Sequence, residues 1–174
     1  MTMPDEAQST VDPEIVERAR SHEPDRYLAA LLSPLTVRAD LLALVAFTAD
    51  LVRIPTVVTE PMMGEIRLQW WRDQFGPLAG GATTAHPLAD ALGRAIRTHH
   101  LPVPLLTAMT EARAFDLYAD PLTDEAALEG YMTKTEAIPF ELTLRILGVD
   151  EAVAGRLAQP AGRAFGLSRL AADL

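Results

Sequence analysis

The hydrophobic residues of the chain follow the spacing of α-helices along most of its length. The stretch Leu41–Phe47 has no polar side chain, and it lies between Asp40 and Asp50. A helix that is apolar on every side is buried on every side. We therefore expect a helix over about 35–53 to form the centre of the fold, with the other elements packed around it.

Capping residues, prolines and glycines divide the remaining pattern into further helices. Asp12-Pro13-Glu14, for example, combines an N-cap residue, a proline at the first helical position and an acid in the first turn. The expected helices span 13–21, 25–32, 61–75, 87–99, 104–119, 125–147, 151–159 and 160–174. Pro55 is expected to end the central helix and Pro139 to kink or split its own helix, while 76–84 should form a loop.

These elements predict an all-α protein. Leucine and alanine dominate the composition, and 49% of the residues are hydrophobic. Short connections between helices are typical of antiparallel neighbours in a bundle. We expect a disordered leader over residues 1–11, which are polar and lack periodicity, and one helical domain over 12–174. On the helix at 61–75, a broad apolar side is expected from Met62, Met63, Ile66, Leu68, Trp70 and Trp71.

Composition excludes several classes of function. A net charge of −9 argues against a nucleic-acid partner, because such partners are bound through basic surfaces. The absence of cysteine excludes disulfides and thiolate metal sites. The acidic start of the sequence lacks the apolar segment of a secretory signal, and no apolar run is long enough to span a membrane. We expect a cytoplasmic location, with peripheral association at an inner membrane as the alternative.

The motifs of common catalytic sites are missing. The sequence has no G-x-S-x-G, no phosphate-binding loop and no H-x-x-x-H pair. Asp116 and Asp120 are four residues apart, a spacing that places two carboxylates on one helical face and suits Mg²⁺. Pro121 follows at once, however, and Asp124 is better interpreted as the N-cap of the next helix. Ordinary caps and solvated faces are the preferred interpretation.

A second polar stripe lies on the helix at 61–75. Glu65, Gln69 and Asp73 recur every four residues, and arginines alternate with them. The functional interpretation is one wall of a groove, with Trp70-Trp71 beside it. The simpler interpretation is a solvent face whose ion pairs each contribute a few tenths of a kcal/mol, and a tryptophan pair that belongs to the core and its rim.

Four stretches resemble the squalene/phytoene synthase family. They are Arg26–Pro34, Val45–Leu51, the run from Glu60 through Gly64–Trp71, and Gly162–Leu167. The resemblance implies an isoprenoid-synthase-like helical bundle. Members of the family join two prenyl diphosphates head to head, with Mg²⁺ held by acidic motifs on facing helices.

The acids of that family are not matched in this sequence. The alignment places the outer acids of the first motif at Val52 and Thr56, which are not carboxylates. The first acid of the second motif falls at Asp173, one residue before the end of the sequence. The C-terminal helices of the family bundle are therefore expected to be missing, and the last helix to need cover from self-association or a partner.

One branch of the family is more similar still. Phe47-x-x-Asp50-Leu51, Glu60 with Gly64–Trp71, and Leu142–Gly148 resemble the branch that assists assembly of mitochondrial respiratory complex I, together with its bacterial relatives. That branch is regarded as non-catalytic. The resemblance implies a scaffolding or assembly factor without a cofactor, whose partner is a complex I subunit or an assembly intermediate.

The resemblance and the polar pattern together give a predicted groove for a substrate or partner, with no catalytic residue. Its residues are Asp50, Arg53, Glu65, Arg67, Gln69, Trp70, Trp71 and Asp116. Two alternatives stay open. One is a Mg²⁺-dependent prenyltransferase that uses Asp50, with Asp116, Asp120 and Asp173 as metal ligands. The other is a carrier of an isoprenoid or another lipid, and a homo-oligomer is compatible with each of these functions.

Overall fold

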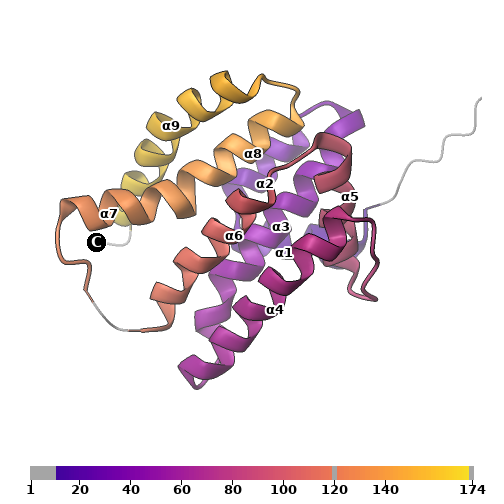
Figure 1. Cartoon of the computed structure of the whole chain (residues 1–174). Helices are drawn as coiled ribbons and strands as arrows, with labels where there is room; N and C mark the ends of the chain where they lie inside the picture. Colours follow the sequence, from indigo (N-terminus) through magenta and orange to yellow (C-terminus); the bar gives the residue numbers. More distant parts are fainter. Residues whose placement is uncertain (1–10, 119–120, 173–174) are drawn as a thin grey trace, which may run out of the picture.

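The computed structural model describes residues 11–118 and 121–172, and in these residues it confirms the all-α prediction (Figure 1). The described residues contain no strand. The elements are α1 Pro13–His22, α2 Pro24–Leu31, α3 Leu35–Val57, α4 Pro61–Ala79, α5 Pro87–His99, α6 Val103–Ala112, the 3₁₀ turn η1 Arg113–Leu117, α7 Glu125–Met132, the π-helical turn η2 Thr133–Ala137, α8 Ile138–Ile146 and α9 Glu151–Ala172.

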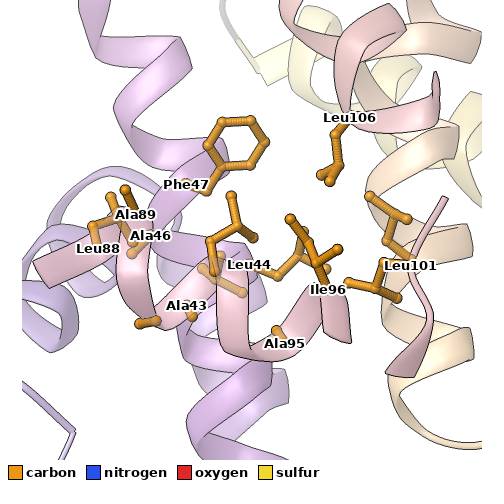
Figure 2. Close-up of a cluster of buried hydrophobic side chains, with 14 of the residues drawn as sticks. Ala43, Leu44, Ala46, Phe47, Leu88, Ala89, Ala95, Ile96, Leu101 and Leu106 are labelled. Atoms are coloured by element: carbon orange, nitrogen blue, oxygen red, sulfur yellow. The ribbon is translucent and has the colours of Figure 1, made fainter. Parts of the chain in front are cut away.

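Helix α3 is the centre of the bundle, as its apolar sequence predicts. It packs against α1, α2, α4, α5 and α8, and each residue from Asp40 to Ala49 is buried. Figure 2 shows side chains of α3 facing those of α5 and the segments that follow it. The labelled members of this cluster are Ala43, Leu44, Ala46, Phe47, Leu88, Ala89, Ala95, Ile96, Leu101 and Leu106.

Three prolines lie inside helices, which corrects the predicted boundaries. Helix α3 continues past Pro55, α4 continues past Pro77, and α9 runs unbroken through Pro160. In α4 the extra turn buries Leu78 completely, and the Leu78 carbonyl accepts a hydrogen bond of 2.6 Å from Arg97. Phe75 and Leu78 are buried on the two sides of Pro77, and their burial outweighs the one hydrogen bond that this proline removes.

The apolar side predicted for α4 is wrong in part. Met62, Met63 and Ile66 are more than half exposed, at 73%, 51% and 57%. Two apolar stripes run along this helix, and only one of them faces the neighbouring helices α5 and α6. The buried stripe consists of Gly64, Leu68, Trp71, Phe75 and Leu78.

Helix α7, the turn η2 and helix α8 form one continuous rod over residues 125–146, and α9 lies on it (Figure 1). The predicted helix at 104–119 ends at Ala112 and tightens into η1. After it, the Asp124 side chain accepts a hydrogen bond from the Ala127 N–H, so its predicted role as an N-cap is confirmed. The helix that follows passes from α7 through η2 into α8, and the π-helical turn accommodates Pro139 without splitting the rod.

A stripe of small residues lets α9 lie close to this rod. The buried residues of α9 are Ala154, Ala158, Gly162 and Gly166, spaced every four residues along one face. Leu157, Leu167 and Leu170 of the same helix are about half exposed. No helix in the described part of the chain has both the length and the apolar character needed to cross a membrane. The predicted leader lies outside the described residues except for Val11, which packs against the core.

Candidate functional site

Five of the predicted groove residues line one open hollow of about 300 Å³. They are Asp50, Arg53, Arg67, Trp70 and Trp71. The hollow lies between α1, α3, α4 and the loop before α5, and we call it the α3–α4 groove. Arg18 of α1 and His86, the N-cap residue of α5, complete its lining and were not among the residues predicted for the groove.

Asp50 accepts hydrogen bonds from two other residues that line the α3–α4 groove. One carboxylate oxygen accepts a hydrogen bond from the Arg18 guanidinium, and the other accepts one of 2.9 Å from the Trp71 indole N–H. Trp71 is 2% exposed, so its N–H depends on Asp50 for a partner. The carboxylate thus satisfies a buried donor and neutralises one of the three arginines that line the groove.

We expect Asp50→Ala to lower the free energy of unfolding by about 1–3 kcal/mol, because a buried donor is left without an acceptor. Asp73→Ala is the matched control: Asp73 accepts from Gln69 on the exposed side of α4, and its loss should cost less than about 0.5 kcal/mol. Urea unfolding followed by tryptophan fluorescence measures both. Equal losses in the two variants would contradict the role assigned to Asp50.

Aromatic rings form the floor of the α3–α4 groove. The ring centroids of Trp70 and Trp71 are 5.0 Å apart in an edge-on arrangement, and Phe47 of the core meets Trp71 at 4.8 Å. The His86 ring lies 5.2 Å from Trp70, and its Nδ1 accepts a hydrogen bond of 3.3 Å from the Ala89 N–H. With Nδ1 serving as the acceptor, the neutral ring carries its proton on Nε2.

The charge of the α3–α4 groove is opposite to that of the chain. Three arginines and one aspartate line the groove, whereas the whole chain carries a net charge of −9. Arg18 is paired with Asp50, but neither Arg53 nor Arg67 forms an ion pair with any described residue. Two guanidinium groups, with their planar forks of N–H donors, are therefore available beside an aromatic floor.

Three other predicted residues lie outside the α3–α4 groove. Glu65 accepts a hydrogen bond of 2.9 Å from the Tyr118 hydroxyl, and Gln69 bonds to its neighbours Arg72 and Asp73 on the exposed side of α4. For Gln69, the structure matches the simpler interpretation of a solvent face. Asp116 lies in a separate, interior cluster of charges.

That cluster, which we call the interior charge network, joins α2, η1, η2 and α9. Glu136 is 7% exposed, and its carboxylate contacts Arg26 at 2.7 Å, Arg113 at 3.6 Å and Arg169 at 3.9 Å. Glu23 is 2% exposed and pairs with Arg26 at 2.7 Å and Arg169 at 3.0 Å. Three arginines are balanced by these two acids and Asp116, so the network is electrically neutral.

Asp116 is engaged on both sides within this network. It accepts hydrogen bonds of 3.1 Å from Arg113 and 2.5 Å from the Tyr131 hydroxyl. These contacts do not suit a metal ligand, because the carboxylate faces a cation and a donor. Asp120 and Asp173, the other residues of the metal alternative, lie outside the described residues. Over residues 11–118 and 121–172, no three His, Asp or Glu side chains are grouped as metal ligands.

The surroundings of the network raise the pKa values of Arg113, Tyr131 and Arg169; for Arg169, burial lowers the pKa and the nearby Glu23 and Glu136 outweigh it. Burial alone would lower the pKa of Arg113, but Tyr131, Asp116 and Glu136 outweigh it and raise that pKa above its ordinary value. Burial raises the pKa of Tyr131 far above its ordinary value; the positive Arg113 opposes this shift, and the hydrogen bond to Asp116 adds to it. The guanidinium stays charged and the phenol stays neutral at physiological pH.

The raised pKa of Tyr131 predicts a loss of stability in alkali. In the unfolded chain a tyrosine ionises near about pH 10. Since the folded chain holds the proton to higher pH, ionisation above that value favours unfolding, by up to about 1.4 kcal/mol per pH unit. In urea unfolding, the stability difference between the wild type and Tyr131→Phe should be constant below about pH 9 and should shrink above about pH 10. A difference that does not change with pH would contradict this.

Sequence reasoning missed most of the interior charge network. Glu136 lies one helical turn from Met132 and from Phe140, so a charge interrupts an apolar face. That interruption is the signal that marks a buried, paired acid. A hollow of about 190 Å³ beside the network is lined by Arg113, Tyr131, Glu136 and Arg169, together with Val52. Val52 is one of the two positions at which the family resemblance places an acid.

Comparisons with known proteins agree with this helical fold. The family model for squalene/phytoene synthase matches residues 19–174, which is most of the chain. The chain therefore belongs to the squalene/phytoene synthase family. It is similar to curated proteins named NADH dehydrogenase (ubiquinone) complex I, assembly factor 6.

The similarity to these relatives extends over most of this chain and half of theirs. The protein of Bos taurus is 30% identical over 159 residues, which are 91% of this chain and 48% of that protein. The protein of Homo sapiens is 28% identical over 152 residues, 87% of this chain and 46% of that protein. The chain thus spans about half the length of the curated relatives that it matches.

Proposed function

We propose that the protein is a non-catalytic member of its family that assists the assembly of respiratory complex I by binding a protein partner. The observation that carries this proposal is the similarity to complex I assembly factors over about nine-tenths of the chain. The proposed place of action is the inner membrane surface, where a complex I intermediate is available.

The interior of the bundle supports the non-catalytic part of the proposal. Val52 lines the hollow beside the interior charge network, and Thr56 is exposed, with its hydroxyl bonded to the Arg53 carbonyl at 2.8 Å. Neither side chain supplies the carboxylate needed to hold Mg²⁺ against a diphosphate. Asp116, which belongs to the network, is bonded to Arg113 and Tyr131 instead.

A deletion experiment tests the assembly role. In the organism that encodes the chain, removing the gene should lower the amount and the NADH–quinone reductase activity of complex I, while isoprenoid products stay unchanged. Expression of the wild-type chain should restore complex I. Unchanged complex I in the deletion strain would overturn the assembly role.

A separate assay tests the enzyme alternative. Purified protein is incubated with farnesyl or geranylgeranyl diphosphate and Mg²⁺, and diphosphate release is measured. We expect no release above a sample without protein. Release that depends on Mg²⁺ and is abolished by Asp116→Ala would overturn the non-catalytic proposal.

An apolar hollow favours lipid binding as a second candidate function. A space of about 290 Å³ between α2, α3 and α8 is lined mainly by apolar side chains, among them Leu41, Val45, Phe140 and Leu147. Ligand pockets are typically apolar with a small number of polar groups, and here Arg26, Ser33 and Thr143 supply them. Native mass spectrometry of the purified protein should show a bound lipid if this candidate is right. A spectrum of the bare chain alone would exclude it.

A further inference from the structure

We propose that the α3–α4 groove binds an acidic segment of a protein partner, with Arg53 and Arg67 holding its carboxylates. This inference rests on the proposed function, because it names the chemistry by which the partner is recognised. It starts from the two guanidinium groups that line the groove and form no ion pair with any described residue.

The α3–α4 groove is lined by more positive than negative side chains. Arg18 is neutralised by Asp50, and no acid within residues 11–118 and 121–172 pairs with Arg53 or Arg67. Glu14 and Glu17 line a neighbouring hollow that shares Arg53, but neither pairs with it; Glu17 accepts a hydrogen bond of 2.7 Å from Ser21 on its own helix. Although the chain as a whole carries a net charge of −9, the positive side chains of this groove attract negatively charged groups.

Arg53 and Arg67 differ in their exposure to solvent. Arg53 is half-buried on α3, where it is partly shielded from water, and Arg67 is exposed on α4. Both side chains present planar forks that match the two oxygens of a carboxylate. Ion pairs of a partly buried arginine are screened less by salt than those on an open surface. Arg53 is therefore expected to contribute more to affinity, and Arg67 more to the rate of association.

The floor of the α3–α4 groove supplies aromatic contacts beside the two arginines. Trp70 is half-buried beside the His86 ring, whose Nδ1 caps α5 and whose Nε2–H donates to no residue that the structure describes. Aromatic side chains and arginine are the residues that carry most of the energy at protein interfaces. An extended acidic segment that places an apolar side chain over Trp70 and carboxylates on the two arginines uses each of these groups.

The two tryptophans of the chain make the test direct. Trp70 and Trp71 both line the α3–α4 groove, and the chain has no other tryptophan. Any change in intrinsic fluorescence on binding thus reports on the groove itself. The probes are a fluorescein-labelled peptide of alternating glutamate and leucine and the same peptide with glutamine in place of glutamate. Anisotropy gives the affinity for the full chain, and an unlabelled copy is used for tryptophan emission.

The variants are Arg53→Gln, Arg67→Gln and the control Arg156→Gln. Arg156 is an exposed arginine of α9, far from the groove in sequence, and its substitution makes the same change in net charge. We expect the glutamate peptide to bind and to change tryptophan emission. Arg53→Gln should weaken binding about tenfold and Arg67→Gln about fivefold, whereas Arg156→Gln should weaken it less than about twofold. The glutamine peptide should not bind measurably.

Four results would overturn the inference. They are equal affinity for both peptides, equal affinity of all three variants, no change in tryptophan emission, and binding of anionic phosphatidylglycerol vesicles without binding of the peptide. The double variant Arg53→Gln/Arg67→Gln, returned to the deletion strain, separates this inference from the proposed function. If it restores complex I as well as the wild type does, the groove proposal fails and the assembly role stands. If the wild type itself has no effect on complex I, the assembly role fails, whatever the peptide binds.

Discussion

Replacing Glu136 by glutamine is expected to lower the free energy of unfolding by about 3–5 kcal/mol, the usual cost of breaking a buried ion pair from one side. Glu136 contacts three arginines, Arg26, Arg113 and Arg169, and only Glu23 and Asp116 remain to balance them in the variant. A surplus cation is then held away from water. Chemical denaturation of the folded chain, followed by circular dichroism, measures the loss.

Glu129→Gln is the matched control for this variant. Glu129 lies two helical turns earlier on the same rod and pairs with Arg163 at 2.7 Å, but both side chains are exposed, at 45% and 57%. Exposed pairs contribute about 1 kcal/mol or less, so this variant should remain close to the wild type. In a double-mutant cycle, Glu136→Gln and Arg26→Gln should be less than additive by about 1–3 kcal/mol. Additive losses, or a loss at Glu136 no larger than at Glu129, would refute the account of the network.

Replacing Gly162 by alanine is expected to destabilise the protein by about 1–3 kcal/mol, the typical cost of overpacking. A Cβ atom at this position would lie 2.4 Å from both Cα and N of Ala137, which are backbone atoms of η2 and cannot rotate away. Helix α9 would have to move off the rod. Because Arg169 lies on the same helix, the interior charge network would loosen with it.

Gly155→Ala offers a control within the same helix. The nearest atom to a Cβ at Gly155 is a side-chain oxygen of Glu141 at 3.8 Å, an ordinary contact distance. Alanine is about 1 kcal/mol more favourable than glycine inside a helix, so this variant should be slightly more stable than the wild type. The two substitutions are chemically identical and should change stability in opposite directions. Destabilisation of similar size in both would show that close packing at Gly162 is not the cause.

The centre of the fold could be predicted from the sequence because its signal is strong and local. Leu41–Phe47 has no polar side chain, and a helix without a polar face has no stable place except in the interior. The amphipathic stripe of α4 was ambiguous, since Met62 and Ile66 are as apolar as Leu68. Only the positions of α5 and α6 decide which stripe is buried, and a single-helix pattern does not contain them.

Prolines were weaker boundary signals than their local chemistry indicates. Pro160 has no N–H, so the carbonyl of Arg156 lacks its usual helical hydrogen bond. Both residues are exposed, and water can donate to that carbonyl instead. The packing of Ala158 and Gly162 against the rod then holds α9 together on both sides of the proline. Tertiary contacts of this kind are invisible to residue-by-residue rules.

The site was predictable where it follows one helix and unpredictable where it needs several. Arg67, Trp70 and Trp71 share a short stretch of α4, and the sequence singles them out together. Arg18 comes before α4 in the sequence and His86 comes after it, yet both line the same groove. No rule of residue spacing connects either of them to α4. The interior charge network is harder still, because Glu23 and Arg169 are 146 positions apart.

The π-helical turn η2 determines which side chains of α8 face the core. The Ile138 N–H bonds to the Thr133 carbonyl five residues back, so the backbone holds one residue more than an α-helix would at this point. Five consecutive residues, 135–139, are buried there, more than a regular helical stripe would hide. Deleting one residue from the turn would rotate α8 by about 100° relative to α7, and Leu142 and Ile146 would leave the core. The extra residue of η2 therefore fixes the rotation of α8 relative to α7. If the turn were replaced by regular α-helix, the buried faces of the two helices would no longer point to the same core.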